Sequence, residues 1–287
     1  MSAEELARGL SKLSMAALLR FVAAILWLAA SSLIISILPY LPRMYVIVYK
    51  LQAKMISPSQ LPPWFAEVAM KSMIASILMI IGLIILAVSA YAFLWPAFSA
   101  LNRGSEKFRI SNILVKVGLL GYTFTLIGNV ILGQYVGIQI ANVMRSHLSI
   151  FAKMLLVKKI VSTYLPIFTT FSGLLTLFAV LVIAGICIGL AVIARITGSK
   201  IHYVSLILLA LAEIIYIVSG AAYIAAYSSP MSLGMHISMM SIGAGIVSYI
   251  LFIIAPILIF IGCRADISKV RQLEETELAR STTTSTG

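Results

Sequence analysis

The stretch that decides the fold is IHYVSLILLALAEIIYIVSGAAYIAAY, residues 201–227. It supplies the ~20 apolar residues that a helix needs to cross a bilayer, yet Glu213 lies near its middle. At about 100° per residue, its polar side chains fall within an arc of about 80° on an otherwise aliphatic helix. The members of this polar stripe are His202, Ser205, Glu213, Tyr216, Gly220, Tyr223 and Tyr227. A membrane helix of this kind is expected to turn its stripe toward other helices and its remainder toward lipid.

The composition of the whole chain also indicates a membrane protein. Of its 287 residues, 61% are hydrophobic and 10% are charged, and the mean hydropathy is +1.08. A soluble fold has too little interior to bury so much apolar surface, so the lipid bilayer is the expected solvent and partner. The net charge of +12 is carried by short loops and span ends, where it suits anionic lipid headgroups. No basic segment with stacking aromatics stands apart from the spans, so we expect no nucleic-acid partner.

Six apolar stretches are predicted to cross the membrane as helices, because unpaired backbone groups find no water in the hydrocarbon. They cover residues 15–38, 72–95, 113–141, 167–194, 201–227 and 239–262. Pro39 and Pro96 are expected to end the first two spans, and Pro166 precedes the fourth. The predicted fold is therefore an all-α bundle of six transmembrane helices over residues 15–262.

The segments outside the spans have patterns of their own. Residues 1–14 are predicted to form an amphipathic lead-in on the cytoplasmic surface, residues 263–280 a helical extension into the cytoplasm, and residues 281–287 a disordered tail. Residues 43–54 and 144–163 combine cations with apolar faces, and they are too short or too charged to span. We expect these two to be interfacial amphipathic helices that lie flat on the outer side.

The distribution of lysine and arginine predicts the orientation. With six spans both termini share a side, and that side holds twelve Lys and Arg residues, Arg20 among them, against eight on the other. The positive-inside rule then places both termini in the cytoplasm of a cell-membrane protein. Residues 15–107 and 113–200 share an order of span, flat helix, re-entry, span and basic loop. They form either an internal repeat followed by the hairpin 201–262 or a chance similarity.

Glu213 is the first candidate for a functional residue. It is the one acidic residue among nine that lies within a predicted span, where an ionised carboxylate is costly. The residues expected around it are Tyr216 and Tyr223 on its own stripe and Tyr122, Thr125 and Asn129 on the span at 113–141. Two roles stay open. Glu213 is either a site that couples transport to protons or cations, or a hydrogen-bonded acid that pins the helix packing.

Glycine pairs at four-residue spacing are candidates for close helix packing. They are Gly133 with Gly137 and Gly185 with Gly189. Small residues at positions i and i+4 let two helix backbones approach closely, which makes packing the main interpretation. A hinge or flexible gate is the alternative.

The stretch MSLGMHISMM, residues 231–240, has the ligand types of a metal site. Met231, Met235 and Met239 recur at four-residue spacing beside His236. Thioether and imidazole ligands suit Cu(I), which is a soft ion. The chain has thirteen methionines in all, however, and adaptable apolar packing is the simpler explanation. No cofactor is predicted.

Motifs of familiar enzyme classes are missing from the sequence. It has no phosphate-binding loop, no His-Glu-x-x-His, no Gly-x-Ser-x-Gly and no Asp within a predicted span. The sequence therefore predicts a protein that is not an enzyme. The two functions that remain are a transporter or channel with proton or cation coupling at Glu213, and a scaffold. The scaffold would bind lipid, partner proteins or a second copy, the proteins through the cytoplasmic tail.

Two blocks of the sequence carry a resemblance to a known family. One is the basic amphipathic opening GLSKL at residues 9–13. The other is the block at residues 93–128, where an apolar span, a proline and a short loop lead into VGLLGYTFTLIG. The chain resembles a family of archaeal multi-pass membrane proteins known only as a domain of unknown function. The resemblance implies a polytopic membrane fold and no particular activity.

Overall fold

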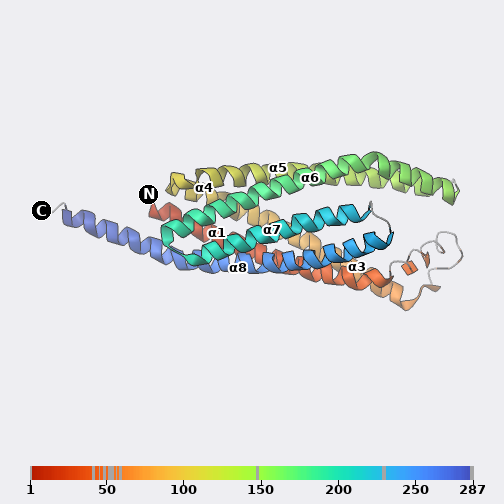
Figure 1. Ribbon diagram of the computed structural model, residues 1–287, viewed down its shortest axis with the longest axis horizontal. Coiled ribbons are helices and arrows are strands. Elements are labelled where there is room, and N and C mark those ends of the chain that lie inside the picture. Colours follow the sequence, from red (N-terminus) through yellow and green to blue (C-terminus); the bar gives the residue numbers. More distant parts are fainter. Residues whose placement is uncertain are drawn as a thin grey trace.

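The computed structural model describes residues 2–40, 43–44, 46–47, 50, 55, 57, 60–146, 149–227 and 231–284. The elements found in this part of the chain are all helices, and Figure 1 shows them side by side in an elongated bundle. In chain order they are α1 (Ala3–Ile37), η1 (Leu38–Tyr40), α3 (Pro63–Val88), the π-helical η3 (Ser89–Leu94), α4 (Trp95–Gly104), η4 (Glu106–Phe108), α5 (Arg109–Arg145), α6 (Ile150–Thr197), α7 (Lys200–Tyr227) and α8 (Met231–Thr284).

Among the described residues, six helices are long and apolar enough to cross a membrane, which confirms this part of the prediction. They run over Ala3–Ile37, Pro63–Gly104, Glu106–Arg145, Phe151–Thr197, Lys200–Ser219 and Ala244–Val270. Several are longer than the expected spans. The 35 residues of α1 rise about 50 Å, against the ~30 Å of a hydrocarbon core. The bundle is therefore longer than a bilayer is thick.

Three helical hairpins build the bundle. α1 packs against α3 and α4, α5 against α6, and α7 against α8. The hairpins are joined because α8 also packs along α1 and α6 along α7. Figure 1 shows the N-terminus of α1 and the C-terminal end of α8 at the same end of the molecule. We call this end, which also holds η4 and the turn between α6 and α7, the basal end, and the opposite end the distal end.

The basal end contains the main hydrophobic core. Phe98, Phe108 and Leu190 are fully buried there, together with Leu6 and Leu10 from the first turns of α1. Aromatic and leucine side chains from four separate segments thus meet at one level. Such interlocking of large apolar side chains is what holds a helix bundle in a unique arrangement.

The first fourteen residues do not form a separate surface helix. α1 begins at Ala3 and continues without a break into the apolar part of the chain. Leu6, Leu10 and Leu13 are 2–3% exposed, since they pack against α4, α6 and α8. The apolar side of the predicted lead-in at residues 1–14 therefore contacts protein.

Pro96 does not end the second span, and that prediction is wrong. α3, η3 and α4 follow one another as one helical stack. A proline lacks the N–H of a helical residue, and its ring clashes with the carbonyl four residues back. Just before the proline, Trp95 N–H donates to Ala90 O, which lies five residues back. This wider π-turn, with the proline in the first turn of α4, lets the helix continue.

The second predicted flat helix is not a separate element. Residues 150–163 are the start of α6, which runs through Pro166 to Thr197. A proline is tolerated within a long apolar helix when neighbouring groups or a local change of helical pitch satisfy the backbone carbonyl that it leaves without a donor. The first predicted flat helix, at residues 43–54, lies for the most part outside the described residues.

The distal half of the bundle is sparsely packed within the chain. Over its 26 residues α3 buries Val68, Ala75 and Gly82. On α5, Ile131 is 64% exposed and Ile138 is 59% exposed. Long helices that present large apolar side chains outward have the surface that lipid would cover.

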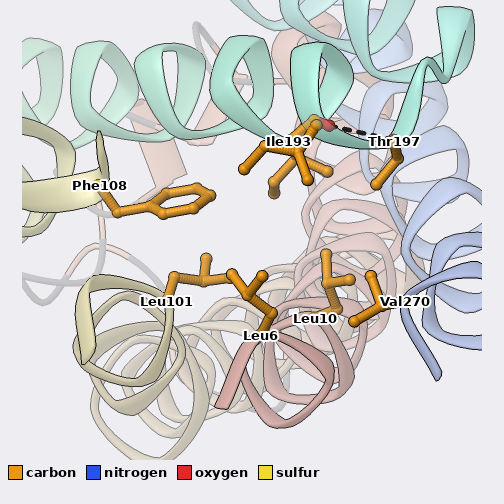
Figure 2. A pocket seen from close by; sticks show the side chains of 8 residues that line it. Leu6, Leu10, Leu101, Phe108, Ile193, Thr197 and Val270 are labelled. Carbon is orange, nitrogen blue, oxygen red and sulfur yellow. Dashed lines mark hydrogen bonds between the residues drawn. The ribbon is translucent and has the colours of Figure 1, made fainter. Parts of the chain in front are cut away.

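A small pocket lies at the basal end between α1, α4, α6 and α8, and Figure 2 shows its walls. Its volume is about 10 Å³, which is close to the space of one water molecule. The lining is apolar except for Thr197, whose hydroxyl donates to Ile193 O at 3.0 Å. This pocket is a packing gap in the core, and it is too small for a solute.

Candidate functional site

Glu213 lies on the buried face of α7. It is 8% exposed, while His202 and Ser205 on the same face are fully buried. Tyr216 is 48% exposed, and its ring packs edge-on against Phe252 of α8 with 6.4 Å between the centroids. The polar stripe therefore divides: its first three side chains lie in the helix interface, and Tyr216 lies at the edge of that interface.

α8 is held against α7 directly beside Glu213. Ser248 Oγ donates to Ala212 O at 2.8 Å, and both residues are fully buried. A hydroxyl that donates to a carbonyl of the neighbouring helix satisfies its polar group inside an apolar region. Because Glu213 follows Ala212, its backbone is fixed with respect to α8.

Arg20 of α1 carries the charge opposite to Glu213. The two side chains interact electrostatically, but no ion pair within 4.0 Å joins these two described residues. Arg20 Nε is buried and has no hydrogen-bond partner. The assignment of Arg20 to the cytoplasmic side of the first span stays a prediction. Because α1 begins at Ala3, Arg20 lies about five turns inside the helix.

The three candidates on α5 are placed differently. Tyr122 is close enough to interact electrostatically with Glu213 and Tyr216. Thr125 is buried, and its hydroxyl donates to a carbonyl one turn back on its own helix at 2.7 Å. Asn129 Oδ1 is buried without a hydrogen-bond partner. Tyr122 is therefore the α5 side chain that the structure brings to Glu213.

The π-helix η3 is fastened to the helices on both sides of this charged site. Ser89 Oγ donates to Ala16 O of α1 at 2.9 Å, and Tyr91 Oη donates to Leu119 O of α5 at 3.2 Å. Ala16 lies about one helical turn before Arg20 on α1, and Leu119 lies about one turn before Tyr122 on α5. π-turns recur at functional sites in helices, where they widen the backbone locally. Sequence reasoning missed η3 because Pro96 was interpreted as the end of a span.

The two glycine pairs lie in different surroundings. A Cβ at Gly185 would lie 2.8 Å from Val115 Cγ2, and one at Gly189 would lie 2.5 Å from Phe98 Cε1. These two glycines allow α6 to approach α5 and α4. A Cβ at Gly133 or Gly137 would meet no atom within 4 Å. The second pair therefore has no close neighbour within the described chain.

The candidate metal ligands cannot be placed. The backbone of residues 231–240 forms the start of α8, but the side chains of Met231, Met235, His236 and Met239 lie outside the described part of the structure, as does that of Tyr223. Where side chains are described, no group of three or more His, Cys, Asp or Glu is arranged to hold a metal ion. Copper binding stays a prediction.

A second polar cluster joins α6, α7 and α8 near the basal end. His202 Nε2 and Asp266 Oδ2 are 2.8 Å apart, and both side chains are fully buried. Thr197 Oγ1 lies 2.8 Å from the same carboxylate oxygen, and Lys269 Nζ lies 3.4 Å from the other. Sequence reasoning missed this cluster because it assigned Asp266 to a solvated cytoplasmic extension. Two features of the sequence could have indicated the cluster: a histidine on the polar stripe and an acidic residue just after the last predicted span.

Comparison with known proteins adds no assignment to this geometry: no family model matches the chain, and neither a curated protein nor a solved structure matches it. The resemblance to archaeal multi-pass proteins therefore stays a prediction.

Proposed function

We propose that the chain is a multi-pass membrane transporter or channel in which proton binding at Glu213 is coupled to the movement of a solute. The observation that supports this proposal is the pair of opposite charges, Arg20 and Glu213, on separate hairpins. They lie within electrostatic range among apolar helices without forming a direct ion pair. Ionisable groups inside a membrane are costly, and they are typical of proton relays and ion pathways.

The charges suggest how a proton would act. An ionised Glu213 attracts Arg20 and so draws α1 toward α7. A proton on Glu213 removes the negative charge, and the neutral acid can then donate a hydrogen bond, for which the Tyr122 hydroxyl is a candidate acceptor. The hairpins would thus have two arrangements that differ by one proton, and a coupled transporter needs two such states.

Arg20 also favours a proton over a metal cation at this site. A metal ion bound to Glu213 would be repelled by the neighbouring guanidinium, which stays charged at all physiological pH values. A proton adds no net positive charge beyond neutralising the carboxylate. We therefore narrow the coupling ion to a proton.

Proton flux into proteoliposomes tests the proposal. Under an imposed pH gradient, a trapped pH-sensitive dye should report proton entry for the wild type. We expect Glu213→Gln to slow it at least tenfold. Glu67→Gln is the matched control, because Glu67 is an exposed carboxylate paired with Lys71 at 2.7 Å. Equal proton flux in the wild type and Glu213→Gln, or proton flux in neither, would contradict the proposal.

A double variant separates coupling from packing. Arg20→Gln alone leaves Glu213 without its counter-charge and should destabilise the protein. Arg20→Gln combined with Glu213→Gln removes both charges, so it should regain much of the lost stability while proton flux stays low. If the double variant regained flux along with stability, Glu213 would act as a packing residue.

The alternative function is a scaffold that binds lipid, partner proteins or a second copy of the chain. Two observations favour it. α8 continues past the rest of the basal end to Thr284, as Figure 1 shows. The open glycine pair on α5 also leaves room for another helix. A truncation after residue 270 should then lose co-purifying partners or change the oligomeric state seen by native mass spectrometry. A scaffold is also expected to show no proton flux in the proteoliposome assay, even as the wild type.

The orientation we propose places both termini in the cytoplasm. The N-terminus and the end of α8 lie at the same end of the bundle, as an even number of spans requires. The excess of Lys and Arg on that side favours the cytoplasmic face, where basic loops would also contact anionic headgroups.

A further inference from the structure

The cluster around Asp266 connects three helices at the point where the chain turns from α6 into α7. Thr197 is the last residue of α6, and the turn that follows contains Gly198 at φ 67°, in the left-handed region. Ser199 N–H donates back to Thr197 Oγ1 at 3.4 Å. Asp266 of α8 contacts both Thr197 and His202, so one carboxylate fastens this turn to α8.

His202 is enclosed by the backbone of α8. A Cβ at Gly262 would lie 2.7 Å from His202 Cε1, so only a glycine leaves room for the ring. Cys263, the next residue, is fully buried as well. The imidazole is therefore in close contact with α8 on this side and is fully buried.

The cluster satisfies the single N–H of a neutral imidazole. With a proton on Nε2, His202 donates to Asp266 Oδ2, and Lys269 balances the charge of the carboxylate from 3.4 Å. His202 Nδ1 and Asp266 Oδ1 are buried and have no hydrogen-bond partner. The charges that act on the ring are those of Asp266 and Lys269. α6 adds the uncharged Thr197, and α1 adds leucines at the pocket that Thr197 lines.

We propose that the His202–Asp266 pair is a pH-sensitive latch, which ties the α6–α7 turn to α8 and opens when His202 takes up a second proton. The added proton would sit on Nδ1, where a buried N–H finds no acceptor. It would also place a second positive charge beside one carboxylate that Lys269 already neutralises. The closed latch therefore excludes this proton, whereas an open latch exposes the imidazole to water and binds it.

The direction of the pH dependence follows from this difference. A histidine in water titrates near pH 6.5. Because the open state binds more protons than the closed state, the latch is fully stable above that value and weakens as the pH falls below it. The latch does not depend on transport at Glu213, which lies 11 residues further along α7, about 16 Å away.

The buried thiol of Cys263 reports latch opening in the full-length protein. Cys187→Ser leaves Cys263 as the single cysteine, since the chain has two. Its rate of reaction with 4,4′-dithiodipyridine is measured in detergent at pH 7.5 and pH 5.5. Each rate is divided by the rate for protein unfolded in SDS at the same pH, which removes the titration of the thiol itself. We expect the normalised rate to rise at least tenfold at pH 5.5.

Two variants decide whether His202 causes this rise. His202→Gln keeps a donor near the position of Nε2 but cannot titrate, so its normalised rate should be the same at both pH values. Lys269→Gln removes a half-exposed lysine and should fold normally. Without the competing charge an imidazolium fits better beside Asp266, so the acid-induced rise should fall to half or less.

The outcomes are distinct from those at Glu213. Glu213→Gln in the single-cysteine background should keep the full pH response, because it leaves the cluster intact. A wild-type rate that does not change with pH overturns the latch. So does a rise in His202→Gln as large as in the wild type, or a Lys269→Gln response equal to that of the wild type.

Discussion

The two ends of the bundle are built differently, although both consist of the same long apolar helices. At the basal end, Phe98 and Leu190 are fully buried, and Gly189 makes room for the Phe98 ring. Near the middle of α5, Phe124 is 74% exposed, and further toward the distal end a methyl group added to Gly137 would meet no atom within 4 Å. Contacts within the chain therefore hold the basal end together, while the distal half presents apolar surface that few contacts within the described chain cover.

This difference has a consequence for function. Helix pairs with few interlocking side chains can move against each other at lower cost than a packed core can. The Arg20–Glu213 site lies between the basal core and the distal half. On α1, Arg20 is about one turn further from the basal end than Ala16, which η3 contacts. A basal core that stays fixed and a distal half that rearranges would place the charged site at the boundary of the motion.

The largest expected effect comes from a matched pair of phenylalanines. Phe98→Ala removes a fully buried ring and leaves a cavity, so it should lower the free energy of unfolding by about 3 kcal/mol or more. Phe124→Ala removes an exposed ring and should change it by less than about 0.5 kcal/mol. SDS titration of the purified variants measures both. Similar losses for the two would mean that the Phe124 ring is packed as tightly as the Phe98 ring.

A pair of glycines on α5 should show the next largest effect. A Cβ at Gly118 would lie 2.7 Å from Val182 Cγ2 and 2.8 Å from Val182 N. Gly118→Leu should therefore force α5 from α6 and destabilise the protein by roughly 2–3 kcal/mol. Gly137→Leu meets open space and should be neutral or stabilising by up to about 1 kcal/mol, since leucine favours helix. Thermal unfolding followed by circular dichroism would reveal the ordering, and a reversed order would contradict it.

Two serines give the smallest expected difference. Ser89 is fully buried and donates to α1, whereas Ser76 is exposed and donates to Ser72 O one turn back on its own helix. Ser89→Ala should cost about 1 kcal/mol, because a contact between two helices is lost. Ser76→Ala should cost almost nothing. If Ser89→Ala also left the free energy of unfolding unchanged in SDS titration, the hydrogen bond from η3 to α1 would not stabilise the protein as described.

Hydropathy predicts the helices well because the solvent leaves few alternatives. A run of apolar residues in lipid must satisfy its backbone internally, so the existence of six helices follows from composition and length. The buried position of Glu213 follows similarly from the stripe on α7. Both predictions depend on the residues of a single helix and require no knowledge of its neighbours.

What sequence reasoning missed depends on contacts between helices. Arg20 was counted with the cations at the start of the first span because nothing local shows that residues 3–14 pack against α4 and extend α1. The His202–Asp266 pair joins residues 64 positions apart. Pro96 has the local chemistry of a helix end, and only the π-turn before it shows that the helix continues. In each case the deciding interaction comes from a neighbouring segment.

The π-helix η3 can also be described as a helix turn that contains one residue more than an α-helical turn. One residue added to a helix turns everything after it by about 100° about the helix axis. Phe98 and Leu101, which lie beyond η3, face the basal core in this rotated setting. Deleting a single residue from this segment would return the turn to α-helical spacing and rotate both side chains out of the core. The direction in which α4 points its core side chains, relative to α3, thus depends on one residue.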